Sequence, residues 1–231
     1  MTAKLPLPPV QGMARTTQAS VTHYLRQAIL SGDLPPGTRL VQAELAEALK
    51  VSVTPIREAL RELSTGGLID LDAFRGAVVH TPTLHELEEI FEIRVVLLPL
   101  NIRQGVQEIT PEALERAAVL AKQMEKEPDQ LTWVGLNRQF HEVLYQAHPN
   151  QRLQQILQQL ADVADLYINL SFADNPLQRS SADREHNLLV EAYRQRDSDQ
   201  AAAIAVDHIN STLEAARSVL HGHRGDRHRS R

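Results

Sequence analysis

Residues 35–79 decide the fold, and they read PPGTRLVQAELAEALKVSVTPIREALRELSTGGLIDLDAFRGAVV. Apolar residues at helical spacing predict a short helix at about 42–49 and another that ends near Thr65, where two glycines follow. Two short apolar segments, 68–71 and 77–80, flank a polar turn and predict a β-hairpin. Two helices followed by a hairpin are typical of a winged helix-turn-helix.

A further helix is expected before this motif. From about residue 16, apolar side chains such as Val21, Leu25 and Ile29 repeat at helical spacing. We therefore predict a winged helix-turn-helix DNA-binding domain over residues 16–80, with its third helix in the major groove and its hairpin tip on the adjacent backbone or minor groove. The proline-rich residues 1–15 show no periodic pattern and are predicted to be a flexible tail.

The rest of the chain is helical by pattern. Residues 81–83 are the expected linker, and a capping box of Thr83 and Glu86 predicts the start of a long helix. Short polar joints separate the amphipathic helices across 84–220, which indicates an antiparallel all-helical bundle of about six helices. The charged residues 221–231 are predicted to be a second flexible tail. The fold class is thus mainly α.

Composition narrows the functional classes. The 231 residues include no cysteine, which excludes disulfides, thiolate metal sites and a cysteine nucleophile. No stretch of about 18 uninterrupted apolar residues occurs, and the N-terminus lacks the apolar core of a signal peptide, so we expect a cytoplasmic protein without a membrane partner. The formal charge of −5 is concentrated in the C-terminal part, which leaves a near-neutral N-terminal part compatible with DNA binding.

Polar residues on the third predicted helix form the candidate DNA-reading surface. Thr54, Arg57 and Arg61 lie on the face opposite the apolar positions. An arginine there can bind a phosphate or the edge of a guanine. The alternative is an ordinary solvated charged face, which the neighbouring Glu58 and Glu62 favour.

The quoted stretch resembles the N-terminal domain of the GntR family of regulators. The shared pattern is PPG-x-x-L, then LA-x-x-L-x-VS-x-TP-x-REAL-x-x-L, then a wing that ends in RG-x-x-V. The chain departs from the family at Val53, where many members carry a base-reading arginine, so we expect less guanine readout there and contact with a thymine methyl instead. The resemblance implies that the operator is approached by Arg39, Ser52, Thr54, Arg57, Arg75 and Gly76.

Three histidines of the C-terminal part fall on largely apolar helix faces. Asn137, His141, His186 and His208 could converge on Zn²⁺, Mn²⁺ or Ni²⁺, because a bundle directs inward side chains of different helices to one axis. The alternative for each histidine is a hydrogen-bonded core residue.

The C-terminal half also resembles the FadR-type (FCD) ligand-binding domain, and the six-helix VanR-like group is one candidate within it. The resemblance implies a metal held by Asp-x-x-x-His and two later histidines. Asn137 stands at the aspartate position here, and a neutral amide is a weaker ligand, so occupancy of the site could depend on an anionic effector.

Arg94 on the first long helix is the expected effector contact. It is flanked by apolar residues, and an arginine inside a bundle needs an anion, for which a carboxylate is the best partner. The resemblance implies an effector-binding arginine at this place as well. Many relatives have an acid four residues later, where this chain has Leu98 followed by Pro99, which would leave Arg94 freer for a ligand. The alternative is that Arg94 extends to the surface.

Together these features predict a ligand-responsive transcription regulator and not an enzyme. We expect a homodimer that binds double-stranded operator DNA and acts as a repressor released by a small organic acid, with residues 84–220 responsible for effector binding and dimerisation. Two alternatives remain at this point: a metal-dependent hydrolase built on the three histidines, and a sensor whose effector is the metal ion itself.

Overall fold

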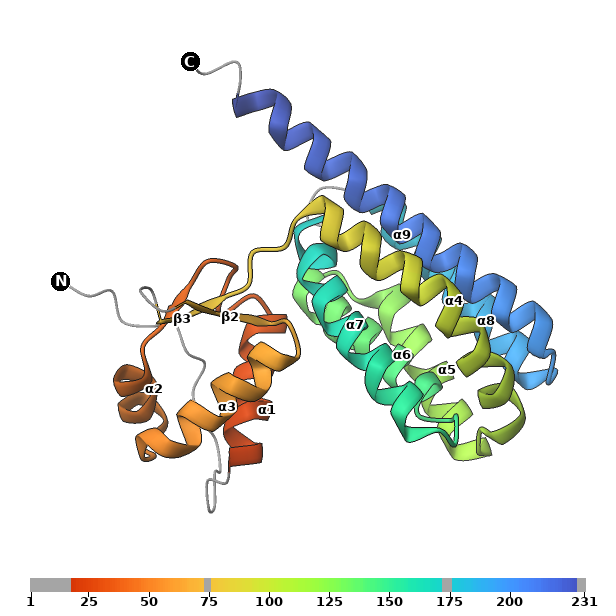
Figure 1. The fold of residues 1–231 in the computed structure, drawn as a ribbon. Coiled ribbons are helices and arrows are strands. Elements are labelled where there is room, and N and C mark those ends of the chain that lie inside the picture. Colours follow the sequence, from red (N-terminus) through yellow and green to blue (C-terminus); the bar gives the residue numbers. More distant parts are fainter. Residues whose placement is uncertain (1–17, 73–75, 172–175, 228–231) are drawn as a thin grey trace. The chain divides into compact units, whose positions relative to one another are not determined.

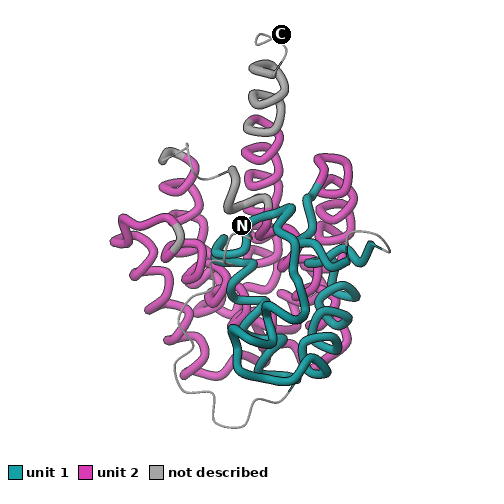
Figure 2. The backbone as a smooth tube through the Cα atoms, turned by 90° about the vertical axis from the view of Figure 1, so that its left-hand side faces the viewer, with its two compact units in different colours: residues 1–82 teal, residues 83–231 magenta. Residues whose placement is uncertain are grey.

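The computed structural model describes the backbone of residues 18–72, 76–171 and 176–227, and most side chains within these ranges. The chain divides into two compact units, Met1–Pro82 and Thr83–Arg231 (Figure 2). The predicted tail at 1–15 lies outside the described residues, as does the turn of the wing at 73–75.

The first unit is built around the amphipathic helix α3. Ile56, Ala59, Leu60 and Leu63 are buried on one face of α3, which packs against α1 and α2. Because these positions are three and four residues apart, they share one face and leave the other to solvent. The elements are α1 (Gln18–Leu30), β1 (Arg39–Leu40), α2 (Gln42–Leu49), α3 (Val53–Thr65), β2 (Ile69–Asp72) and β3 (Gly76–Val79) (Figure 1).

The predicted hairpin is confirmed, and a third strand joins it. β2 and β3 pair antiparallel, with Ile69 opposite Val79. β1 adds to the other edge of β3, with Arg39 opposite Val78, so that the strand order is β1-β3-β2. Sequence analysis missed β1, because a strand of two residues is too short to show an alternating pattern.

The second unit is an all-helical bundle, as predicted. The long first and last helices, α4 and α9, lie side by side (Figure 1). The helix α4 continues through Pro99, and its start is capped by Thr83, whose hydroxyl accepts a hydrogen bond from the Glu86 amide at 3.2 Å. The helices are α4 (Leu84–Glu108), α5 (Pro111–Lys126), α6 (Gln130–Tyr145), α7 (Gln151–Ser171), α8 (Pro176–Arg194) and α9 (Ser198–Arg227).

The last helix is longer than expected. It was predicted to end near residue 220 and instead continues to Arg227. The segment 221–227 contains glycines and no proline, and isolated glycines weaken a helix without ending it. No helix among the described residues is long and apolar enough to cross a membrane.

The interior of the bundle is apolar except at one place. Large side chains such as Phe91, Trp133, Phe140 and Tyr193 are almost fully buried. Polar groups in a core need partners or a ligand, because burying them alone is unfavourable. Among the described residues of this unit, the buried polar or charged ones are Arg94, Asn101, Asn137, Asp162, Asp165, His186, His208 and Thr212.

Candidate nucleic-acid interface and metal centre

The outward side of α3 carries the predicted DNA contacts. Ser52, Val53, Thr54, Arg57 and Arg61 are all exposed. Ser52 is the N-cap residue of α3, but its side chain makes no capping hydrogen bond, which leaves the hydroxyl available to another partner. The Arg57 Nε lies 3.4 Å from Glu58 Oε1 in an exposed ion pair, the kind that contributes little to stability. The structure thus groups these residues on one solvent-facing surface.

The wing supplies two more of the predicted positions. Arg39 is exposed on the edge strand β1. Gly76, the first residue of β3, is exposed and has φ of +76°, a conformation that favours glycine, with no atom within 4 Å of the Cβ position. Arg75 lies outside the described residues.

Three histidines from three helices meet inside the bundle. The ring centroids of His141 and His186 are 5.2 Å apart, those of His141 and His208 are 5.1 Å apart, and those of His186 and His208 are 4.8 Å apart. One nitrogen from each ring can be chosen so that all three lie within 4.8 Å of one another. Three imidazole nitrogens at this separation can be ligands of one divalent ion. The convergence expected from the sequence is present.

The polar atoms around this cluster favour a ligand over a hydrogen-bonded core. Both ring nitrogens of His186 and the Oδ1 of Asn137 are buried without a hydrogen-bond partner among the described residues. Burial lowers the pKa of His141 and of His186 well below the ordinary value of 6.5, and the neighbouring His208 lowers both further. Neutral imidazole nitrogens and an unpaired amide oxygen can each donate an electron pair to a divalent cation, so the residues present fit a metal.

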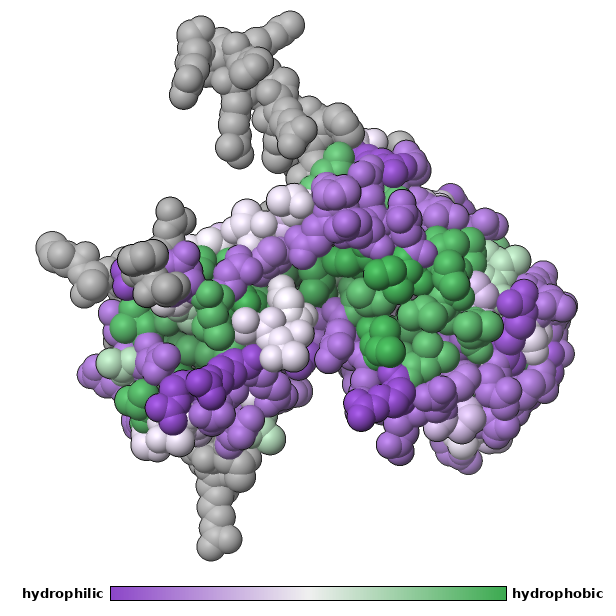
Figure 3. Space-filling view, in the orientation of Figure 1, coloured by the Kyte–Doolittle hydropathy of each residue, from purple (hydrophilic) through white to green (hydrophobic). Residues whose placement is uncertain are grey.

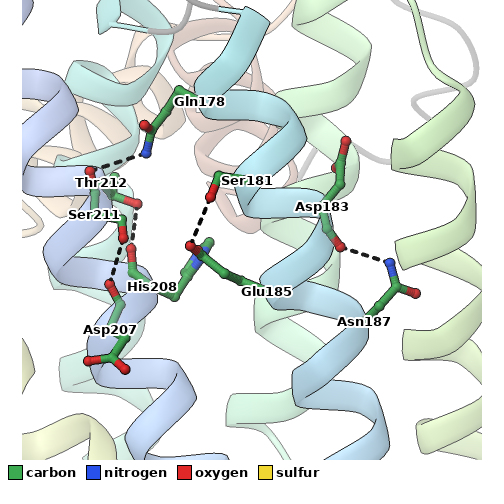
Figure 4. Close-up of polar contacts among 9 residues, drawn as sticks. All are labelled: Gln178, Ser181, Asp183, Glu185, Asn187, Asp207, His208, Ser211 and Thr212. Atoms are coloured by element: carbon green, nitrogen blue, oxygen red, sulfur yellow. Dashed lines mark hydrogen bonds and ion pairs between the residues drawn. The ribbon is translucent and has the colours of Figure 1, made fainter.

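Glu185 holds the third histidine. Its Oε2 lies 2.7 Å from the Nδ1 of His208, and its Oε1 accepts a hydrogen bond from Ser181 at 3.3 Å (Figure 4). Burial would raise the pKa of Glu185, but the hydrogen bonds and the charge of His208 outweigh burial and lower it. An ionised Glu185 accepts a hydrogen bond from the protonated Nδ1 of His208, which leaves the Nε2 of His208 as the atom that can bind a metal.

Arg94 is buried and does not reach the surface. Only 5% of the residue is exposed, and its Nη2 donates a hydrogen bond to the Tyr145 hydroxyl at 3.3 Å. Its guanidinium carbon lies 5.0 Å from the centroid of the Phe91 ring, while its Nε has no partner among the described residues. A buried guanidinium with a free donor is suited to bind an anion.

Two buried acids on α7 were not predicted from the sequence, and one of them, Asp165, lies close enough to this arginine for their charges to interact. Asp162 and Asp165 on α7 are 1% and 6% exposed. Burial, together with the charge of Asp162, raises the pKa of Asp165 from 3.8 to about 7, although Arg138 and Arg94 lower it. The sequence signal was present, because these are the only acids in the apolar run LADVADL. The interior acid that seemed lost at Leu98 is therefore supplied by another helix.

One cavity is lined by His141, His208, Arg94 and Asp165. The centre of a water molecule can occupy about 30 Å³ of it, more than the roughly 10–15 Å³ that one water needs. The cavity therefore has room for about two or three water-sized groups, so that only a small ligand would fit. Its walls include Arg94, Trp133, Asn137, His141, Tyr145, Asp165 and His208.

Comparisons with known proteins agree with both halves of this description. Residues 17–79 match the bacterial regulatory proteins of the gntR family, and residues 89–211 match the FCD domain. The chain belongs to the GntR family. It has the family's N-terminal helix-turn-helix domain and a C-terminal FCD domain.

The similar proteins are transcription regulators, and the similarity covers most of their length. The chain is 28% identical over 205 residues to the uncharacterised HTH-type transcriptional regulator YdhC of Bacillus subtilis, covering 86% of this chain and 90% of that protein. It is 30% identical over 196 residues to the gluconate operon transcriptional repressor of Bacillus licheniformis, covering 80% and 78%. The solved structure of Escherichia coli McbR/YncC has the same fold, with a TM-score of 0.78, 24% identity and coverage of 89% and 99%.

These matches make this GntR-family protein a transcription regulator. Regulators of the family bind operator DNA and typically dimerise. FCD domains are often metal-binding, which agrees with the histidine cluster.

Proposed function

We propose that this protein is a metal-containing repressor that releases its operator when a small carboxylate enters the cavity of the helical domain. The observation that carries the proposal is that two histidines of the cluster, Asn137 with its orphaned amide oxygen and the buried Arg94 line the same cavity. Such a site binds an anion, and the winged domain of the same chain supplies an output that the anion can control.

The outward face of α3 is proposed to read the operator. Arg57 and Arg61 would bind phosphates or guanine edges, and Ser52 and Thr54 would donate to phosphates. Val53 is 45% exposed, and an apolar side chain there would contact a thymine methyl rather than a guanine. On the wing, Arg39, Arg75 and Gly76 are proposed to approach the adjacent backbone.

The metal would be held by Asn137, His141, His186 and His208. When bound, a divalent ion supplies a cationic centre that an oxygen of the effector can coordinate. Because burial keeps His141 and His186 neutral, a divalent ion bound there would retain much of its positive charge, and an anionic ligand would be favoured at any open position. Zn²⁺, Mn²⁺ and Ni²⁺ all suit three imidazoles.

Arg94 is proposed to hold the effector's carboxylate. Its hydrogen bond to the neutral Tyr145 hydroxyl is weaker than a charge-assisted hydrogen bond to a carboxylate would be. The names of two similar regulators support an organic metabolite as effector and repression as the mode of control: the gluconate operon repressor mentioned above, and the probable D-xylose utilization operon repressor of Paenarthrobacter nicotinovorans, 28% identical over 206 residues.

An apolar surface on α4 is proposed to form the homodimer. Ile93, Val96 and Leu100 are 47%, 66% and 55% exposed, and their spacing places them along one side of the helix. Figure 3 shows apolar side chains gathered over this part of the helical unit. Exposed apolar patches of this kind mark interfaces, and a two-fold dimer would place two winged domains on two half-sites.

The proposed functions are divided between the two compact units. We propose residues 16–80 for DNA binding, 81–83 as the linker and 84–220 for effector binding and dimerisation, in a protein that acts in the cytoplasm. The effector changes DNA affinity only to the extent that it binds the DNA-bound and free arrangements differently.

The test uses the full-length protein and a duplex selected by it from a randomised pool. Lactate and propionate are added in turn while DNA binding is followed by fluorescence anisotropy. We expect at least one acid to weaken binding tenfold or more in the native protein and to have no effect on Arg94→Met. If no acid changes DNA affinity but removal of the metal does, the protein is a metal sensor and the effector proposal is wrong.

A further inference from the structure

The carboxyl of Asp165 is an unexplained feature of the effector cavity. It lines the cavity together with Arg94 and two of the histidines, and 6% of the residue is exposed. The cluster of candidate metal ligands consists of three histidines and does not include it. No side chain that the structure describes donates a hydrogen bond to it.

We infer that Asp165 is a specificity residue, which selects effectors that carry a hydroxyl or ammonium group close to the carboxylate. The inference deepens the proposed function, since it assumes that Arg94 and the metal hold the carboxylate. Asp165 then accepts a hydrogen bond from the second group of the same ligand. The effector class is that of small hydroxy acids and amino acids.

The chemistry of the cavity supports two unlike subsites. Arg94 offers donors and positive charge, whereas Asp165 offers acceptor oxygens. A buried acceptor without a donor is unfavourable, and a ligand hydroxyl or ammonium group would remove that penalty.

A purely structural role for Asp165 makes a different prediction. The positive charges of Arg94 and Arg138 both act on Asp165, so the acid could serve only to balance them. In that case its removal would change the affinity for all carboxylates alike. A specificity role changes the ratio of affinities between ligands with and without a donor.

Size limits the ligand to a few heavy atoms, given the cavity volume of about 30 Å³ open to water centres. Four three-carbon acids make a matched set: propionate, 2-hydroxypropionate, 3-hydroxypropionate and 3-aminopropionate. They share the carboxylate and differ in the presence, place and charge of the donor.

Dissociation constants of these acids are measured by calorimetry on the full-length Zn²⁺-loaded protein. At least one substituted acid should bind about tenfold more tightly than propionate, the gain of one well-formed hydrogen bond. In Asp165→Leu this preference should fall to within twofold, while propionate binding persists. Asp165→Asn, which keeps an acceptor oxygen, should retain the preference for a hydroxy acid and lose any for 3-aminopropionate.

The matched control is Asp162→Asn, since Asp162 is buried on the same helix but does not line the cavity. This variant should keep the preference. Equal binding of all four acids by the native protein, or an unchanged preference in Asp165→Leu, overturns the inference and leaves the carboxylate site intact. If none of the acids binds, both the inference and the proposed effector site are wrong.

Discussion

The Nδ1 of His208 lies 2.7 Å from the Oε2 of Glu185, across the contact between α9 and α8. This hydrogen bond fixes the orientation and the tautomer of the ring before any ligand arrives. It leaves Nε2 of His208 free to bind a metal, as carboxylates that hydrogen-bond to metal-binding histidines do at known sites.

Glu185→Gln is therefore expected to weaken metal binding by about 10–100-fold, as outer-shell substitutions do. The amide keeps the shape of the side chain but loses the charge that makes His208 a better ligand. Competition with a chromophoric chelator for Zn²⁺ measures the effect. Glu191→Gln, an exposed acid on the same helix, should bind Zn²⁺ like the native protein, and equal affinity in both variants would rule out a role for Glu185.

Asn137→Asp should strengthen metal binding by about tenfold, or ~1.4 kcal/mol. A carboxylate is a better ligand than an amide oxygen, and it would reduce the net positive charge of the site. The same chelator assay measures the change, with Asn137→Leu as the opposite control that should bind less tightly than native. A metal affinity that is insensitive to both substitutions would remove Asn137 from the ligand set.

Val96→Glu is expected to convert the dimer to a monomer. It places a charge at the most exposed position of the apolar surface on α4, where burying an unpaired carboxylate against a second copy is unfavourable. Light scattering after gel filtration reports the mass. Leu188→Glu is the control, because Leu188 is 57% exposed on another helix. A Val96→Glu dimer as stable as the native one would contradict the assignment.

The titration of Asp165 should appear in the stability of the metal-free protein. Its pKa is raised from 3.8 to about 7, so between these values the folded protein keeps a proton that the unfolded chain has lost. Stability contributed by this group is present below pH 4 and is lost as the pH rises towards 7, by up to about 4 kcal/mol.

The comparison of native protein with Asp165→Asn isolates this effect. Burial of His141 and His186, whose folded pKa values are depressed, acts in the opposite direction: it lowers stability as the pH falls below 6.5 in both proteins. Between pH 4 and 7, the free energy of unfolding of the native protein should therefore fall relative to that of Asp165→Asn. Urea titration at each pH measures both values. A constant difference across this range would show that Asp165 does not titrate there.

Periodicity was sufficient to predict most of the fold. The buried face of α3 and the convergence of His141, His186 and His208 follow from residues spaced by helical turns, because such residues share one face. The resemblance of residues 35–79 to the GntR family added the proposed operator contacts of Arg39, Ser52, Arg75 and Gly76.

What the sequence could not provide were contacts between helices. Glu185 is next to His186, so it points about 100° away from that residue, and its partner His208 is 23 positions further along the chain. Arg94 meets Tyr145 from 51 positions away. Pairings at such separations depend on how the helices pack, which a single sequence does not record.

We expect the outward face of α3 to bind the operator, and the binding of Arg57→Ala to a selected duplex is the decisive measurement. The measurement is fluorescence anisotropy of the full-length protein over a series of salt concentrations, with Arg116→Ala on α5 as the exposed control. Arg57→Ala should lose about 1–3 kcal/mol of binding free energy without a change in unfolding temperature, while Arg116→Ala should bind like the native protein. Native-like binding by Arg57→Ala, or a native protein that prefers no duplex over another, would contradict it.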